Sequence, residues 1–176
     1  MKKLTVIFGI AILMMPFLSQ AQVFDKYTDM KNVTSMLVTS EMFKLLTEID
    51  YDSTDPETQA YADLIESLNN IQVYSTSDAK IGSKMAMDIQ NYLKTNSMKK
   101  LMSFKEDGKS VEFYSKPGKS DSYVSELLMF MNGMEDGEAE AVIMRITGNV
   151  DLKQISKLAK DLKVPGAKEL ENINEK

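Results

Sequence analysis

The stretch from Tyr123 to Met131 constrains the fold more than any other part of the chain, because it is apolar on both sides of an extended strand. One alternating set comprises Val124, Leu128 and Phe130, and the other comprises Leu127, Met129 and Met131. Successive side chains of a strand point to opposite faces, so a strand with two apolar sets is buried on both sides. The sequence therefore predicts a central strand in a sheet that is covered above and below.

The next segment, from Ala139 to Thr147, predicts a second strand that pairs with the first. Its alternating sets are Val142, Met144 and Ile146 on one face and Ala141, Ile143, Arg145 and Thr147 on a weaker face. Between the strands, Asn132-Gly133 and Asp136-Gly137 tolerate positive φ, which favours an antiparallel hairpin with a loop of several residues. Beyond Gly148, the capping-box spacing of Asp151 and Gln154 predicts a helix extending to Leu162.

The rest of the chain alternates between helical and strand patterns. Helical spacing at Val23, Phe24, Tyr27 and Met30 predicts a short amphipathic segment. Further patterns predict strands over 33–38 and 71–74 and a hairpin over 102–113 that turns at Asp107-Gly108. Helices are expected to start at Thr39 or Ser40, at Asp55-Pro56, and at Ser77 or Asp78. The expected fold class is α+β, a mainly antiparallel sheet of about six strands, two hairpins contributing four, with packed helices.

The first 21 residues have the layout of a secretory signal peptide, with Lys2-Lys3, an apolar run to Leu18 and a small-residue end. Cleavage is expected between Ala21 and Gln22, leaving one domain over 22–164 and a charged, mobile tail over 165–176. A retained membrane anchor is the alternative, but the run is shorter than the ~20 residues of a spanning helix. No cysteine is present to accept a lipid, so the expectation is a soluble exported protein, periplasmic or extracellular.

Composition excludes several chemistries. The chain has no histidine and no cysteine, which removes thiol nucleophiles, Ser-His-Asp triads, imidazole bases and the usual zinc sites. Its net charge of −5 becomes −7 without Lys2 and Lys3, and Arg145 is its one arginine. Nucleic acid and anionic lipid are therefore poor partners.

Some short patterns carry a possible chemistry beside a plainer explanation. Ser77-Asp-Ala-Lys80 and Ser97-Met-Lys-Lys100 have the S-x-x-K spacing of penicillin-recognising enzymes, but without the partner motifs the expected role is a helix cap with a solvated lysine. Acidic clusters at 135–140 and 52–55 lack calcium-loop spacing. The methionines are dispersed over apolar faces, which favours core packing over Cu(I) binding. Asp52-Ser53-Thr54 resembles an O-glycosylation acceptor in an exposed loop.

Five blocks, taken in order, resemble a known family of exported Bacteroidota proteins, the domain of unknown function 4252. The blocks are Phe24-Asp-Lys-Tyr27 before Val33-Thr34, Leu68-x-x-Ile71-Gln-Val-Tyr-Ser75, Glu106-Asp-Gly-Lys-Ser-Val-Glu-Phe-Tyr114, Ser125-Glu-Leu-Leu-Met129 and Ile146-Thr-Gly-Asn-Val-Asp-Leu152. The resemblance implies a Gram-negative envelope protein of unassigned role. Many relatives resemble lipoproteins, and this chain departs from them by lacking the acylated cysteine.

The expected function is that of a non-catalytic envelope protein that binds another protein or a small apolar ligand, without catalytic residues, cofactor or metal. The alternatives are a small hydrolase using carboxylates or the Ser77/Lys80 pair, and a weak metal or ligand carrier. The two apolar faces of the strand at 123–131 pose one further question. Either the chain's own helices cover both faces, or the face of Leu127, Met129 and Met131 is left for a partner.

Overall fold

The structure is a computed structural model that describes residues 23–48, 56–106, 108–120, 123–135 and 138–151. Several sequence-based expectations lie outside these ranges. They are the signal segment with its cleavage between Ala21 and Gln22, the loop acids and glycosylation pattern at 52–55, the helix expected after Asp151, and the tail over 165–176.

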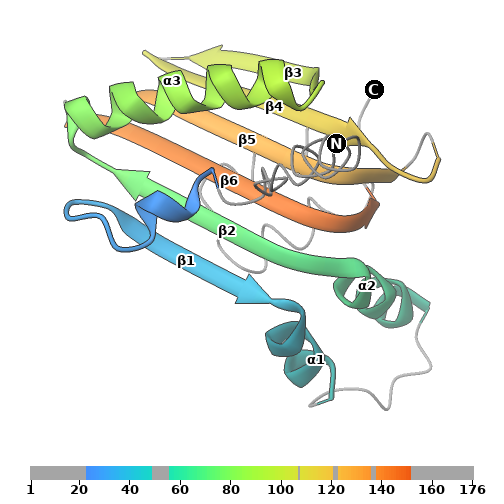
Figure 1. Cartoon of the computed structure of the whole chain (residues 1–176). Helices are drawn as coiled ribbons and strands as arrows, with labels where there is room; N and C mark the ends of the chain where they lie inside the picture. Colours follow the sequence, from blue (N-terminus) through green and yellow to red (C-terminus); the bar gives the residue numbers. More distant parts are fainter. Residues whose placement is uncertain (1–22, 49–55, 107, 121–122, 136–137, 152–176) are drawn as a thin grey trace, which may run out of the picture.

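Six strands form one antiparallel sheet in the order β1-β2-β6-β5-β4-β3 (Figure 1). Their bounds are β1 Thr34–Thr39, β2 Leu68–Thr76, β3 Lys99–Glu106, β4 Lys109–Pro117, β5 Tyr123–Glu135 and β6 Glu138–Asp151. The α+β class, the six strands and the two hairpins β3-β4 and β5-β6 are confirmed. The long strand β5, which is apolar on both sides, lies inside the sheet between β6 and β4.

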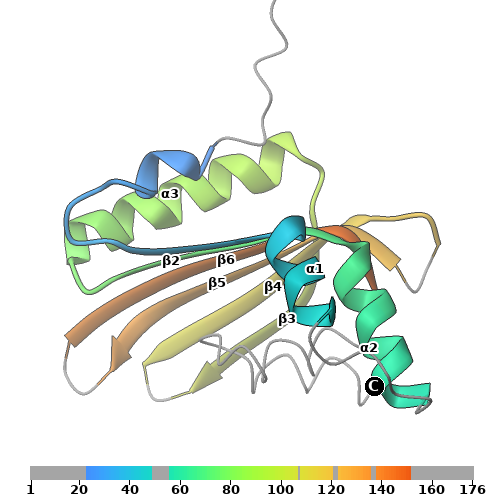
Figure 2. The same cartoon turned by 90° about the horizontal axis from the view of Figure 1, so that it is seen from below.

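The helices lie on both sides of the sheet (Figure 2). The long helix α3 (Ala79–Thr95) and the short 3₁₀ helix η3 (Asp25–Tyr27) cover one face, whereas α1 (Ser40–Glu48) and α2 (Pro56–Ser67) lie at one end of the other face. Helix α3 begins as predicted, because the Asp78 side chain accepts the backbone N–H groups of Lys80 at 2.9 Å and Ile81 at 3.2 Å. Those hydrogen bonds hold the pKa of Asp78 below its ordinary value.

Each face of the sheet carries its own hydrophobic core. On the α3 face, Phe24 and Tyr27 join Met85, Ile89 and Tyr92 of α3 and the sheet residues Tyr74, Tyr114, Leu128, Phe130, Ala141 and Ile143. On the opposite face, Leu64 and Ile65 of α2 join Leu68, Ile71, Val73, Val111, Phe113, Val124, Leu127, Met129, Met131, Val142, Met144, Ile146 and Val150. The prediction that both sides of β5 are buried is confirmed, since Leu127 and Leu128 are both fully buried.

One assignment from simple alternation is wrong. Val124 belongs to the core of Leu127 and Met129, and not to the face of Leu128 and Phe130. Against β4 the pairing of β5 passes from Glu126 to Val124 and leaves Ser125 as an extra residue, whereas against β6 the extra residue is on β6, where Gly148 and Asn149 lie opposite Ser125. The Ser125 hydroxyl donates to the carbonyl of Pro117 at 2.9 Å. A bulge adds one residue, so the side chains before it change faces.

The β5-β6 hairpin is also tighter than expected. Glu135 pairs with Glu138, so both strands run almost to their connection. Asn132 and Gly133 pair with Ala141 and Glu140 and are strand residues, whereas a loop of several residues was expected there. The ladder can continue through Gly133 because the absence of a side chain lets Gly108 of the neighbouring hairpin approach; a Cβ would lie 2.6 Å from the Gly108 carbonyl oxygen.

Candidate functional site

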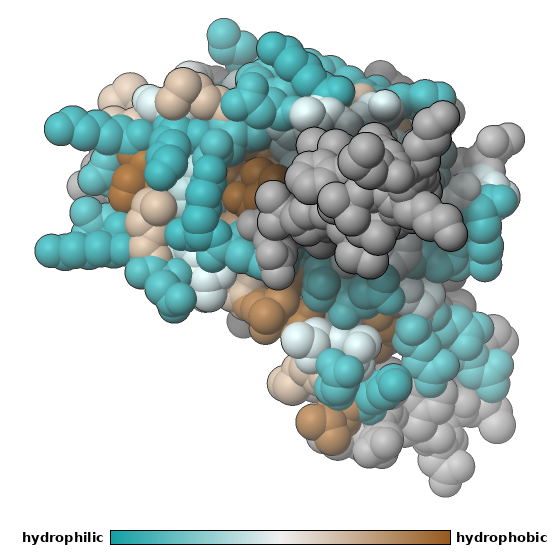
Figure 3. All heavy atoms as spheres, in the orientation of Figure 1, coloured by the Kyte–Doolittle hydropathy of each residue, from teal (hydrophilic) through white to brown (hydrophobic). Residues whose placement is uncertain are grey.

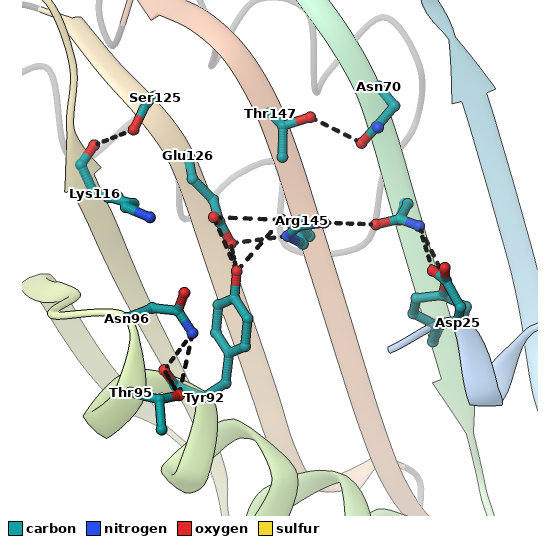
Figure 4. A network of polar contacts seen from close by, with 12 residues as sticks. Asp25, Asn70, Tyr92, Thr95, Asn96, Lys116, Ser125, Glu126, Arg145 and Thr147 are labelled. Atoms are coloured by element: carbon teal, nitrogen blue, oxygen red, sulfur yellow. Dashed lines mark hydrogen bonds and ion pairs between the residues drawn. The ribbon is translucent and has the colours of Figure 1, made fainter. Parts of the chain in front are cut away.

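A polar network lies between α3 and the sheet, centred on Arg145 of β6 and Glu126 of β5 (Figure 4). The arginine Nε donates to Glu126 Oε1 at 2.8 Å, and its NH2 group lies 3.4 Å from Oε2. The two side chains stand diagonally across the β5-β6 ladder, because Arg145 pairs with Leu128, two residues beyond Glu126. Arg145 is 7% exposed and Glu126 is 5% exposed, so this is a buried ion pair.

Tyr92 and Gln72 complete the hydrogen bonds of the pair. The Tyr92 hydroxyl, which extends from α3 toward the sheet, donates to Glu126 Oε1 at 2.8 Å and lies 3.3 Å from an Arg145 nitrogen. On the other side, the Arg145 NH1 group donates to Gln72 Oε1 at 3.2 Å. Gln72 then donates from its nitrogen to Asp25 of η3 at 3.0 Å. The network thus links η3, β2, β6, β5 and α3.

The electrostatics of this network favour a charged pair and a neutral tyrosine. Burial opposes the charge on Arg145, but the hydrogen bonds and negative charge of Glu126 outweigh it and raise its pKa. Burial, followed by the negative charge of Glu126, raises the pKa of Tyr92 to about 12. Arg145, Glu126, Tyr92 and Gln72 provide one another with hydrogen-bond partners and have little contact with solvent. The arrangement is therefore suited to holding α3 on the sheet. In the sequence, the signal for this network was the arginine on the weaker strand face with Ala141, Ile143 and Thr147.

Two hollows lie at the end of the sheet nearest β1. One of about 370 Å³ is lined by Asp25, Thr28, Asp29, Ser35, Met36, Leu37, Gln72 and Tyr74. The other, of about 550 Å³, lies at the start of α3 and is lined by Asn32, Val33, Thr34, Ser75, Thr76, Ser77, Asp78 and Glu140. Both hollows are open to solvent. The residues that line them do not bring together the nucleophile, base and oxyanion donors of a known catalytic arrangement.

The outer strand β1 is an accessible edge of the sheet. It pairs only with β2 among the described strands, so its outer backbone groups face away from the sheet. Its six residues carry no charge, and Leu37 is 59% exposed. Met36 of β1 and Met42 and Leu45 of the adjoining helix α1 are exposed as well. Figure 3 shows apolar side chains at the surface in this part of the molecule, below the central sheet.

The opposite edge strand, β3, is built differently. It carries Lys99, Lys100 and Lys105, all exposed, and its pairing with β4 shifts at Leu101. Lys100 forms an ion pair with Glu112, which also accepts a hydrogen bond from Tyr114 at 2.8 Å. Lysines and bulges are common means of keeping an edge strand from pairing with another chain. Strand β1 has neither, so β1 is our candidate interaction surface.

The S-x-x-K patterns fall at two different places. Ser77 and Lys80 are exposed on either side of the N-cap Asp78, which agrees with the helix-cap explanation. Ser97 adopts a left-handed backbone with φ 52°, and Lys100 is held by Glu112. The second pattern is therefore accounted for by a turn and an ion pair.

The remaining sequence candidates also have definite places. Leu127, Met129 and Met131 are all buried in the core opposite α3, so a partner would reach them only if that face opened. Met129, Met131 and Met144 share this core, whereas Met85 lies in the other. Within the ranges that the structure describes, no group of three carboxylate, histidine or cysteine side chains is arranged to hold a metal ion.

Comparison with known proteins gives one match. The family model described as a domain of unknown function (DUF4252) matches residues 27–158, three quarters of the chain. No curated protein and no solved structure matches. In the described part of the chain, no helix has the length and apolar character of a membrane span. The matched region takes in every strand of the sheet, α1, α2 and α3, and the chain therefore belongs to the DUF4252 family.

Proposed function

We propose that this protein is a non-catalytic binding protein of the cell envelope and that it recognises another protein through the edge strand β1. The observation that carries the proposal is the uncharged, exposed edge of β1 beside the apolar residues Met42 and Leu45 of α1. An extended segment added to such an edge gains main-chain hydrogen bonds, and its alternate side chains contact the two faces of the sheet.

The two faces of β1 offer different contacts to such a segment. Met36 is paired with Val73 and shares the face of the α2 core, whereas Leu37 is paired with Gln72 and shares the face of α3 and η3. The hollow of about 370 Å³ adjoins Leu37 on that second face. A partner strand would therefore find an apolar contact on each side of its backbone.

A binding role also agrees with the chemistry of the chain. It contains neither histidine nor cysteine, and its Arg145–Glu126 pair is engaged internally. A small hydrolase using Ser77, which lines the larger hollow, and Lys80, in the first turn of α3, is the alternative function. A small apolar ligand in place of a protein partner is a further alternative, because Met36 and Leu37 also line a hollow.

The test places a photo-crosslinking amino acid at Leu37 in the protein produced in its native envelope. Met87 on α3, which is 62% exposed, is the matched control position. We expect protein adducts from Leu37 and at least about tenfold fewer from Met87, because only the edge offers backbone pairing. Equal adducts from the two positions, or none from Leu37, would contradict the proposal. Hydrolysis abolished by Ser77→Ala would support the alternative.

Export is part of the same proposal, and it is based on the three-part segment that ends at Ala21 and on the family resemblance to exported Bacteroidota proteins. The mature protein is expected to begin at Gln22 and to carry no lipid. Intact mass spectrometry of the protein isolated from the envelope tests this. A mass that includes residues 1–21, or an acyl group, would count against export of a soluble form.

A further inference from the structure

We propose that β1 pairs with β1 of a second copy of the chain, antiparallel, around a two-fold axis that passes through Leu37. This inference depends on the proposed function, since it names the partner of the β1 edge. It would join two six-stranded sheets into one continuous sheet of two copies.

Strand β1 carries no charge, so it is suited to pair with the same strand of a second copy. All six residues from Thr34 to Thr39 are uncharged, so two copies placed edge to edge bring no like charges together within the strand. The other edge would behave differently, because β3 carries three lysines, and pairing it with itself about Met102 would place Lys99 opposite Lys105. Like charges opposed across a ladder are destabilising, so the self-pairing edge is β1.

Symmetry restricts how the two strands can align. Antiparallel strands from identical chains are related by a two-fold axis perpendicular to the sheet, and that rotation keeps each face of the sheet on its own side. Residues directly opposite each other must then point to the same face, and side chains alternate along a strand. The axis must therefore lie midway between the two copies of one residue, so that this residue is directly opposite itself. It cannot lie between two neighbouring residues of the strand. Met36 and Leu37, near the middle of β1, are the two possible centres.

Leu37 is the better centre. With the axis at Leu37, the most exposed apolar side chain of the strand meets its own copy, Met36 lies opposite Val38, and Ser35 lies opposite Thr39. Each pair is matched, apolar with apolar and hydroxyl with hydroxyl. With the axis at Met36, Leu37 would instead lie opposite the polar Ser35. Burying apolar surface is the main favourable term in such an interface, which selects the Leu37 register.

The adjoining helix supports the same arrangement. Helix α1 follows directly on the last residue of β1, so in an antiparallel pair the α1 of each copy lies beside the beginning of β1 in the other copy. Met42 and Leu45 are exposed on that helix. The pairing thus gives these two apolar side chains, together with Met36 and Leu37, a neighbouring protein surface.

The absence of cysteine allows a direct test of the register. In Leu37→Cys, the cysteines of two copies lie directly opposite, within the Cα separation of about 4.4–6.8 Å that a disulfide requires. In Met36→Cys they lie on a diagonal of about 7–8 Å, which is too far. Under mild oxidation we expect a disulfide-linked dimer of Leu37→Cys and little from Met36→Cys. The reverse result would overturn the proposed register.

The second measurement is the mass of the untreated wild-type protein by sedimentation equilibrium over a range of concentrations. We expect a dimer, and we expect Leu37→Lys to raise its dissociation constant at least about tenfold by opposing two charges. Leu101→Lys, on the other edge at an exposed position, is the control and should leave the mass unchanged. A wild-type monomer throughout would overturn the self-pairing. Leu37 photo-adducts to a different protein would then still support β1 as the binding edge, whereas the absence of any adduct would end both proposals.

Discussion

Arg145 and Glu126 form an ion pair inside the protein, with the arginine Nε 2.8 Å from a glutamate oxygen. Removing two charges from water is costly, and the attraction between them offsets that cost only when the other polar atoms also find partners. Tyr92 and Gln72 supply those partners from α3 and β2. The Tyr92 hydroxyl reaches Glu126 and Arg145 from the position that α3 occupies on the sheet. We therefore interpret the network as a set of contacts that orients α3 on the sheet.

The first prediction concerns the loss of one member of this pair. Glu126→Leu leaves the arginine charge buried without its carboxylate and should lower the free energy of unfolding by about 3–5 kcal/mol. The double variant Glu126→Leu/Arg145→Met removes both charges and should recover a large part of that loss. Equilibrium urea unfolding of the two single variants and the double variant measures the coupling. Simple addition of the two single effects would contradict the interpretation.

The second prediction concerns the two faces of β5. Leu127 and Leu128 point to opposite cores and are both fully buried. Leu127→Glu and Leu128→Glu should each prevent stable folding, because each buries a carboxylate without a partner. The milder Leu127→Ala and Leu128→Ala should each lower the unfolding free energy by about 2–5 kcal/mol.

Circular dichroism and urea unfolding test these variants, with light scattering to follow association. Exposed Met87→Glu on α3 is the control and should unfold like the wild type. If Leu127→Glu folds as stably as wild type and loses a partner, the face of Leu127, Met129 and Met131 is a binding surface after all.

The third prediction is a loss of stability at alkaline pH. Burial raises the pKa values of Tyr27, Tyr74, Tyr92 and Tyr114, to about 12 for Tyr92. A raised pKa contributes stability that is complete below the unfolded value of about 10 and is lost as the pH rises through the folded value. For Tyr92, two pKa units correspond to about 3 kcal/mol.

Thermal unfolding between pH 6 and pH 12 provides the measurement. The melting temperature should change little from about pH 6 to 9, because the chain has no histidine or cysteine to titrate there, and should then fall steeply. Tyr92→Phe should show a shallower fall above pH 10. An unchanged slope in that variant would exclude Tyr92 as a source of the alkaline effect.

The fourth prediction compares two glycines with positive φ. A Cβ at Gly148, where φ is 139°, would lie 2.4 Å from the Ser67 carbonyl oxygen, whereas a Cβ at Gly108, where φ is 84°, would meet nothing within 4 Å. Gly108→Ala should cost about 1 kcal/mol from backbone strain alone. Gly148→Ala should cost clearly more, since α2 must also move from the sheet. Equal unfolding free energies for the two variants would contradict the close approach of Ser67.

Much of the fold could be predicted because its signals are local. The cap at Asp78, the turn at Gly108 and the alternation of Ala141 and Ile143 against Val142 and Met144 each depend on residues close together in the chain. Local hydrogen bonds and side-chain periodicity determine such features directly. The candidate site was less accessible to the same reasoning: the strand over 33–38 was expected, but not its place at the edge.

Only the tertiary structure decided the features that depend on pairing between distant strands. The bulge at Ser125 moves Val124 to the other core, and it arises in the pairing of β5 with its neighbours β4 and β6. Arg145 meets Glu126 and Tyr92 because the β5-β6 ladder and the docking of α3 bring them together. By itself, the amino-acid sequence determined which segments are strands and which faces are apolar. Strand order, which leaves β1 at the open edge, depends on long-range hydrogen bonds that no local pattern specifies.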